Sequence, residues 1–304
     1  MRSELAIEGI FVALATPFTP DGSAIDEDRL RAHLNRLIDA GVHGIVPAGT
    51  TGEFTTLTLA ERKRLTEVCV QVVAGRVPVI PGTGALSTAD AIDLSVHAAK
   101  AGADAVLVIP PYYDGMSLRA LHTYLRRIAE AIDIPIGYYN IPSCSGVTLT
   151  PGELSDLGQI EGVEFIKDTS GDAASLGALL MTQQTTGIAA FNGWDALTLF
   201  ALANGAKATI WGAANLIPEL TVELWSAVAE RADLAEGRRV WEKIWPVCNF
   251  LEGHNYVAGV KCGLSLTGNS VGPSREPVLA FDDAEERELA AVLQAAGLTV
   301  SATR

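Results

Sequence analysis

The chain has 304 residues and a formal net charge of −14, and its composition is 48% hydrophobic and 19% charged, which is ordinary for a globular protein with a sizeable core. An acidic chain lacks the basic face that neutralises phosphates, so we expect neither a nucleic-acid nor a membrane-surface partner. No stretch approaches the roughly 18 apolar residues of a spanning helix, and no basic segment precedes a long apolar run at the start, so we expect a cytoplasmic protein.

The cysteines and histidines show no spacing typical of a disulfide framework or a metal site. The four cysteines are Cys69, Cys144, Cys248 and Cys262. Because they are widely spaced in a large chain without a signal peptide, we expect them to be reduced. The five histidines contain no HxxxH or HExxH pattern, so the sequence predicts no metal site.

Short β-rich runs recur along the first two thirds of the chain, and each is followed by an amphipathic segment. The eight predicted strands are residues 9–16, 44–49, 77–84, 105–111, 134–140, 163–169, 187–193 and 207–213. These runs are almost continuously apolar, which is typical of parallel strands buried on both faces. The sequence therefore predicts an alternating β/α protein with a parallel sheet.

The segments between the strands carry helix signals. Their apolar residues recur at three- and four-residue spacing, which is typical of helices with one buried face. Residues that cap helix starts precede three of them, namely Asp26, Ser87 and Thr150. Glycines suited to left-handed helix ends follow three of them, namely Gly41, Gly75 and Gly102. These signals predict helices between the strands.

Eight strand–helix units favour a closed (β/α)8 TIM barrel over an open doubly wound sheet. The open sheet usually carries GxGxxG after its first strand, whereas the turn here reads TPFTPDGS (16–23). After residue 230 the strand pattern stops and three helical patterns follow. We therefore expect a catalytic barrel over residues 1–230 and a C-terminal helical extension, residues 231–304, packed on it.

Lys167 is the main candidate among the polar residues at the predicted strand ends, where barrels of this type place their active sites. By strand parity it shares a face with Val163 and Phe165, so it is expected to point into the barrel. Burial disfavours the charged ammonium, and a neutral amine can form a Schiff base with a carbonyl compound. From the residue alone, two alternatives remain: an amine that reaches the barrel rim, or one paired with Asp168.

Two tyrosines and one turn are further candidates at the same end of the barrel. Tyr139 and Tyr113 follow predicted strands and are either proton carriers or core aromatic residues. The turn GTTGE (49–53) either presents backbone N–H groups to a carboxylate or is a plain tight turn.

These strand ends, taken in order, resemble those of the dihydrodipicolinate synthase / N-acetylneuraminate lyase family of class I Schiff-base aldolases. The matching stretches are GTTGE (49–53), PPYY (110–113), YYNIP (138–142), IKDTSGD (166–172), NGWDAL (192–197), GAANLIP (212–218), VKCGLSLTG (260–268) and GPSREPV (272–278). The resemblance extends from residue 7 to about residue 280, which is nearly the whole chain.

The resemblance implies a set of catalytic roles. Lys167 would form the Schiff base with a 2-oxo acid such as pyruvate, and Tyr139 would be the general acid/base, linked through Thr50 to Tyr113. In this family the second tyrosine comes from a neighbouring subunit, so a homotetramer built as a dimer of dimers is implied.

The resemblance also implies the residues that bind the pyruvate moiety. Thr50 and Thr51 would hold its carboxylate, and the carbonyl of Ile210 and the backbone at Gly193 would line the same pocket. No metal or organic cofactor is expected, because the lysine supplies the electrophile.

One position departs from the family's synthases, which carry an arginine after the YN-x-P motif to bind the remote carboxylate of the substrate. Here Cys144 takes that place in the substrate-binding region, and the loss of a bidentate carboxylate contact is not conservative. This argues against 4-hydroxy-tetrahydrodipicolinate synthase, and the YNIPxxSG form is closer to the N-acetylneuraminate lyases. Trp194 and Trp211 either narrow the pocket or pack beneath the extension.

The favoured hypothesis is a lyase that cleaves a 2-oxo-3-deoxy or 4-hydroxy-2-oxo acid by a retro-aldol reaction. A dehydratase of a 2-oxo-3-deoxy sugar acid would use the same residues, so the sequence leaves both open. A non-enzymatic 2-oxo acid binding protein is a third hypothesis, but it predicts damage to the Lys–Tyr–Thr set, which is intact.

Overall fold

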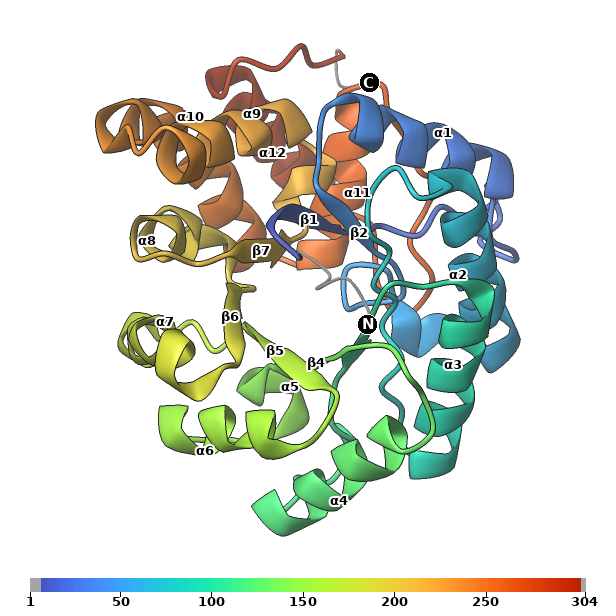
Figure 1. The fold of residues 1–304 in the computed structure, drawn as a ribbon. Coiled ribbons are helices and arrows are strands. Elements are labelled where there is room, and N and C mark those ends of the chain that lie inside the picture. Colours follow the sequence, from blue (N-terminus) through green and yellow to red (C-terminus); the bar gives the residue numbers. More distant parts are fainter. Residues whose placement is uncertain (1–6, 302–304) are drawn as a thin grey trace.

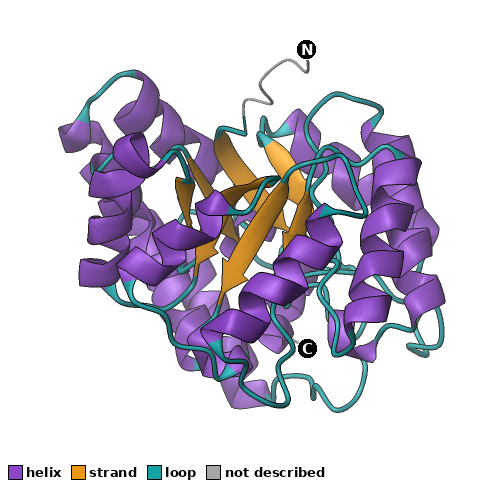
Figure 2. Cartoon of the chain, turned by 60° about the horizontal axis from the view of Figure 1, so that its bottom comes forward, coloured by secondary structure: helices purple, strands orange, loops and turns teal. Residues whose placement is uncertain are grey.

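The strands form one parallel sheet that curves into a barrel surrounded by helices (Figure 1, Figure 2). The computed structural model describes residues 7–301. The strands are β1 Gly9–Ala13, β2 Gly44–Val46, β3 Val106–Val108, β4 Ile136–Asn140, β5 Val163–Asp168, β6 Ala189–Asn192 and β7 Ala208–Trp211. Their order in the sheet is β2-β1-β7-β6-β5-β4-β3. The expected TIM barrel is confirmed, with one change to its strands.

The change concerns the predicted strand at residues 77–84, which forms only isolated bridges to β2 and β3. The amide of Ile45 donates to the carbonyl of Pro78 over 3.0 Å, and the amide of Leu107 donates to that of Pro81 over 2.9 Å. Because the two prolines have no N–H groups, the segment cannot form a continuous ladder on both sides. The prediction of eight full strands was therefore wrong, although this extended segment lies where the missing strand would close the barrel.

The helices of the barrel begin and end largely where the capping signals predict. They are α1 Glu27–Asp39, α2 Leu59–Val73, α3 Thr88–Ala101, α4 Leu118–Ala129, α5 Pro142–Ser145, α6 Pro151–Asp156, α7 Ala173–Thr186, α8 Thr198–Ala203 and α9 Pro218–Trp225. Short helical turns are η1 Phe54–Thr56, η2 Leu157–Gln159, η3 Asp195–Leu197, η4 Ala213–Asn215 and η5 Ser226–Glu230. The side chains of Asp26, Ser87 and Thr150 each accept the amide three residues on, which confirms them as caps.

Three further helices follow the barrel, as predicted: α10 Leu234–Gly253, α11 Tyr256–Leu266 and α12 Asp283–Ala295. Helix α10 packs against α8, α9 and η3, and α11 packs against η4, directly after β7. The extension therefore reaches the carboxyl end of the barrel, next to the strand ends that carry the candidate residues. Within residues 7–301, none of the helices is both long and apolar enough to cross a membrane.

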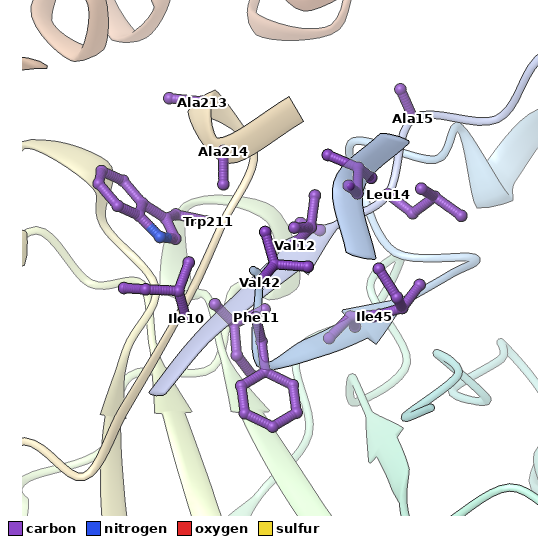
Figure 3. Packing of buried hydrophobic residues seen from close by; sticks show 14 of the residues in the cluster. Ile10, Phe11, Val12, Leu14, Ala15, Val42, Ile45, Trp211, Ala213 and Ala214 are labelled. Carbon is purple, nitrogen blue, oxygen red and sulfur yellow. The ribbon is translucent and has the colours of Figure 1, made fainter. Parts of the chain in front are cut away.

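At some glycines of the strands, a large side chain from a neighbouring strand fills the space that a Cβ atom would take. A Cβ atom on Gly137 would lie 2.0 Å from the ring of Phe165, and that ring stacks on Phe191 with centroids 4.8 Å apart. Figure 3 shows the same kind of packing around β1, where Phe11 lies among buried aliphatic side chains. Val163 does not share a face with Phe165, contrary to the prediction from strand parity. It packs between the sheet and its helices, because the register between β4 and β5 shifts by a residue next to Gly137.

Candidate active site

Lys167 lies near the carboxyl end of β5, and its side chain is buried in the barrel. The residue is 5% exposed, so its amine does not extend to solvent at the rim. Its partner in the sheet register is Tyr139 of β4, and the Nζ atom lies 4.1 Å from the centroid of that tyrosine ring. The parallel register thus places the candidate nucleophile directly beside the candidate acid/base.

The Asp168 carboxylate is not paired with the Lys167 amine, because it accepts hydrogen bonds from other residues. Asn140 donates to its Oδ1 atom over 2.6 Å, and the hydroxyl of Ser170 donates to Oδ2 over 2.9 Å. Burial raises the pKa of Asp168, although these hydrogen bonds oppose the shift. The aspartate therefore holds the ends of β4 and β5 together. Neither a Lys167 amine at the barrel rim nor one paired with Asp168 agrees with these contacts.

A cavity of about 210 Å³ brings together most of the residues predicted from the strand ends. The predicted members are Lys167, Tyr139, Thr50, Thr51, Gly193 and Ile210. The other lining residues are Ala13, Ile141, Thr169, Trp194, Asp195, Trp211, Gly212, Glu252 and Tyr256. Lys167 is the one basic side chain among the described residues that line this cavity.

The threonine turn is held closed by its own backbone. The amide of Glu53 donates to the carbonyl of Thr50 over 3.0 Å, and the amide of Gly52 donates to that of Gly49 over 3.1 Å. Thr51 is buried, whereas Thr50 is exposed at the mouth of the cavity. The turn therefore presents two threonines to the same cavity that Lys167 lines.

Two of the predicted residues lie outside the cavity of the single chain. Tyr113 is 87% exposed, in the loop between β3 and α4. Cys144 lies in α5 and is also exposed. The structure therefore places neither side chain beside Lys167, and the role predicted for Tyr113 needs a second copy of the chain.

Asp195 of the barrel, with Glu252 and Tyr256 of the extension, forms an acidic group in the cavity wall. Asp195 of η3 accepts the Tyr256 hydroxyl and, over 2.9 Å, the amide of Ala213. Glu252 of α10 accepts the amide of Ala196 over 3.0 Å. Burial raises the pKa of Asp195 to about 6 and that of Glu252 to about 7, so both carboxyls bind protons more tightly than usual.

Sequence reasoning found only part of this group. Asp195 belongs to the NGWD stretch at a predicted strand end, but Tyr256 is 61 residues further along the chain. Nothing in the helical period of α10 distinguishes Glu252 from a solvent-facing glutamate. Within residues 7–301, no three His, Cys, Asp or Glu side chains lie together in a way that could hold a metal ion.

Comparison with known proteins extends the likeness to residues 6–296 of the chain. The model of the "Dihydrodipicolinate synthetase family" matches residues 6–296. A 4-hydroxy-tetrahydrodipicolinate synthase of Methanothrix thermoacetophila is 37% identical over 285 residues, which cover 94% of this chain and 95% of the relative.

Two solved structures with pyruvate bound have the same fold. Dihydrodipicolinate synthase of Acinetobacter baumannii, inhibited by chloride and complexed with pyruvate, gives a TM-score of 0.91 at 32% identity, covering 96% of this chain and 99% of that one. The prophage protein YagE of Escherichia coli K12, complexed with pyruvate, gives 0.90 at 29% identity, covering 96% and 99%. The chain therefore belongs to the dihydrodipicolinate synthetase family and is a lyase of the Schiff-base-forming type.

Proposed function

We propose that the chain cleaves a 2-oxo-3-deoxy or 4-hydroxy-2-oxo acid by a retro-aldol reaction through a Schiff base on Lys167. The observation that carries this proposal is the buried Lys167 amine, 4.1 Å from the ring centroid of Tyr139 and in one cavity with Thr50 and Thr51. A nucleophile, a proton carrier and two hydroxyls in one small cavity are what this chemistry requires.

In the proposed reaction, the Lys167 amine attacks C2 of the substrate and water leaves, which gives a protonated imine. Tyr139 accepts the proton of the C4 hydroxyl, the C3–C4 bond breaks, and its electron pair moves into the imine to form an enamine. An aldehyde departs, C3 is protonated, and hydrolysis releases pyruvate and the free amine. Thr50 and Thr51 bind the substrate carboxylate, while Gly193 and Ile210 line the pyruvate moiety.

The Schiff base can be trapped by reducing it. Incubation with pyruvate and borohydride is expected to place a stable adduct on Lys167, because this amine lies in the cavity. Peptide mass mapping locates the adduct. If Lys167 remains unmodified while another lysine carries the adduct, the proposal is wrong.

The second half of the substrate is the open part of the assignment. Glu252 and Asp195 contribute carboxyls to the cavity wall, and position 144 supplies an exposed cysteine where the synthases have an arginine. The two carboxyls of the wall favour an uncharged, hydroxylated group over a second carboxylate. Because the pKa of Glu252 is about 7, both forms of its carboxyl are present at neutral pH. It can therefore donate a hydrogen bond to a substrate hydroxyl or accept one from it.

Replacement of Glu252 tests this assignment. In the condensation of pyruvate with glyceraldehyde, Glu252→Met is expected to lower kcat/KM about ten-fold or more, the effect of losing one hydrogen bond to a charged group. Glu252→Gln, which still forms hydrogen bonds, is expected to lose less. Glu242→Met on the same helix is the control, because Glu242 is exposed and outside the cavity. Unchanged kinetics in Glu252→Met would contradict the role of Glu252.

Two other reactions remain candidates for the same residues. The relatives named 4-hydroxy-tetrahydrodipicolinate synthase favour condensation of pyruvate with aspartate semialdehyde. A dehydratase would expel the C4 hydroxyl from the enamine instead of breaking the C3–C4 bond. A panel of 2-oxo-3-deoxy sugar acids, 4-hydroxy-2-oxo acids, sialic acid and the semialdehyde distinguishes them by product: an aldehyde, a dehydrated acid or a condensed ring.

We further propose a homotetramer, a dimer of dimers, in which Tyr113 reaches the cavity of a neighbouring subunit. The 87% exposure of Tyr113 in the single chain supports this arrangement, because a large aromatic side chain exposed on a loop commonly marks an interface.

A further inference from the structure

A buried ion pair joins the threonine turn to the C-terminal extension. The Nζ atom of Lys261 in α11 lies 2.5 Å from Oε1 of Glu53, and their side chains are only 4% and 1% exposed. The second carboxylate oxygen of Glu53 accepts the backbone amide of Arg275 over 2.8 Å. Glu53 is the last residue of the GTTGE turn, so both contacts act on the turn that carries Thr50 and Thr51.

The backbone of Glu53 needs such support. Its φ of 56° lies in the left-handed region, which is unfavourable for a residue with a Cβ atom. Its amide closes the turn by donating to the carbonyl of Thr50. If the Glu53 side chain were released, the turn could relax, and the hydroxyls of Thr50 and Thr51 would move relative to the Lys167 amine.

The residues that bind Glu53 are themselves fixed. Lys261 also donates to the carbonyl of Pro273 over 2.7 Å, and its Nζ atom lies 4.3 Å from the centroid of the Phe18 ring. The guanidinium of Arg275 lies 4.2 Å from the same ring centroid and binds both carboxylate oxygens of Glu61, at 2.6 and 3.0 Å. The Arg275 hydrogen bond holds the pKa of Glu61 below its usual value. Such a network resists displacement of any one member.

This network has an energetic cost. Burial lowers the pKa of Lys261, although the Glu53 carboxylate opposes the shift, so burial disfavours the ammonium form. A buried ion pair is often no more stabilising than apolar residues of the same volume. The stability of the fold therefore does not by itself explain why this ion pair lies directly behind the turn.

We propose that Glu53 and Lys261 are positioning residues that hold the Thr50–Thr51 turn in the geometry that binds the carboxylate of the 2-oxo acid. This inference rests on the proposed Schiff-base function and deepens it, because it makes the extension part of the pyruvate half of the site. It also gives a physical reason why the stretches 260–268 and 272–278 resemble the family as GTTGE does, although neither contributes a side chain to the cavity.

The test separates binding of the carboxylate from folding. Lys261→Met leaves the Glu53 carboxylate buried without its cation, so this single variant is expected to be less stable. The double variant Glu53→Gln with Lys261→Met removes both charges and is expected to fold with nearly wild-type Tm. In the double variant, KM for pyruvate in borohydride trapping is expected to rise about ten- to a hundred-fold, while the trapping rate at saturation changes little.

The control is the surface ion pair between the partly exposed Lys63 and the exposed Asp93, whose Nζ and Oδ2 atoms are 2.6 Å apart. Lys63→Met is expected to leave both KM and the trapping rate unchanged, since exposed pairs contribute little. A folded double variant with the wild-type KM for pyruvate would overturn the positioning role. Failure of the wild-type protein to form any pyruvate adduct would instead overturn the proposed function, because trapping requires no aldehyde.

Discussion

Replacement of Lys167 with methionine is expected to lower kcat by at least about a thousand-fold, equivalent to about 4 kcal/mol of transition-state stabilisation. Methionine has a similar length and fits a buried site, but it has no amine to form the imine. Lys167 is 5% exposed, so the apolar replacement is expected to keep Tm within a few degrees of wild type or to raise it. Pyruvate release from the cleaved substrate measures the first effect, and calorimetry measures the second.

Lys207→Met is the matched control for this variant. Lys207 is exposed and directly precedes β7, at the end of the barrel opposite the strand ends that form the cavity. It is expected to keep wild-type activity. A Lys167→Met protein that still released pyruvate at more than about a hundredth of the wild-type rate would exclude the Schiff-base mechanism.

The sequence predicts the barrel well because parallel strands and their helices are local patterns. Apolar runs, capping residues such as Asp26, and the spacing between them are all readable within short windows. The strand at 77–84 is the exception, because Pro78 and Pro81 lie in an apolar run that otherwise has strand character. The pattern gives its place in the barrel, whereas the loss of two N–H donors interrupts the hydrogen-bond ladders on either side of it.

The site is predicted less completely, because its wall combines residues that are distant in sequence. The proximity of Lys167 and Tyr139 can be predicted because the ends of neighbouring parallel strands meet at one edge of the sheet, independently of how the helices pack. Glu252 and Tyr256 depend on how the extension packs, and no local signal encodes that. Cys144 was predicted from its neighbours in the chain to be near the substrate, but α5 leaves its side chain exposed.

Replacement of Gly193 is expected to have the second large effect on reactivity, because the absence of a side chain there leaves room for Lys167. A Cβ atom at this position would lie 2.5 Å from Cε of Lys167 and 2.1 Å from Oγ1 of Thr169. Contacts of this kind require the neighbours to move. Its φ is not in the left-handed region, so alanine introduces no backbone strain and the expected effect comes from steric crowding alone.

Gly193→Ala is therefore expected to lower the rate of borohydride trapping at Lys167 about a hundred-fold, the usual cost of displacing a reacting group by about 1 Å. Gly177→Ala is the control, since its Cβ atom would lie an ordinary 3.5 Å from the Phe200 ring, inside α7. There alanine is expected to keep the rate and to stabilise the fold by about 0.5–1 kcal/mol. Wild-type trapping by Gly193→Ala would show that the lysine can react from another rotamer. The combined result thus distinguishes a nucleophile fixed by the strand next to it from one that is merely buried.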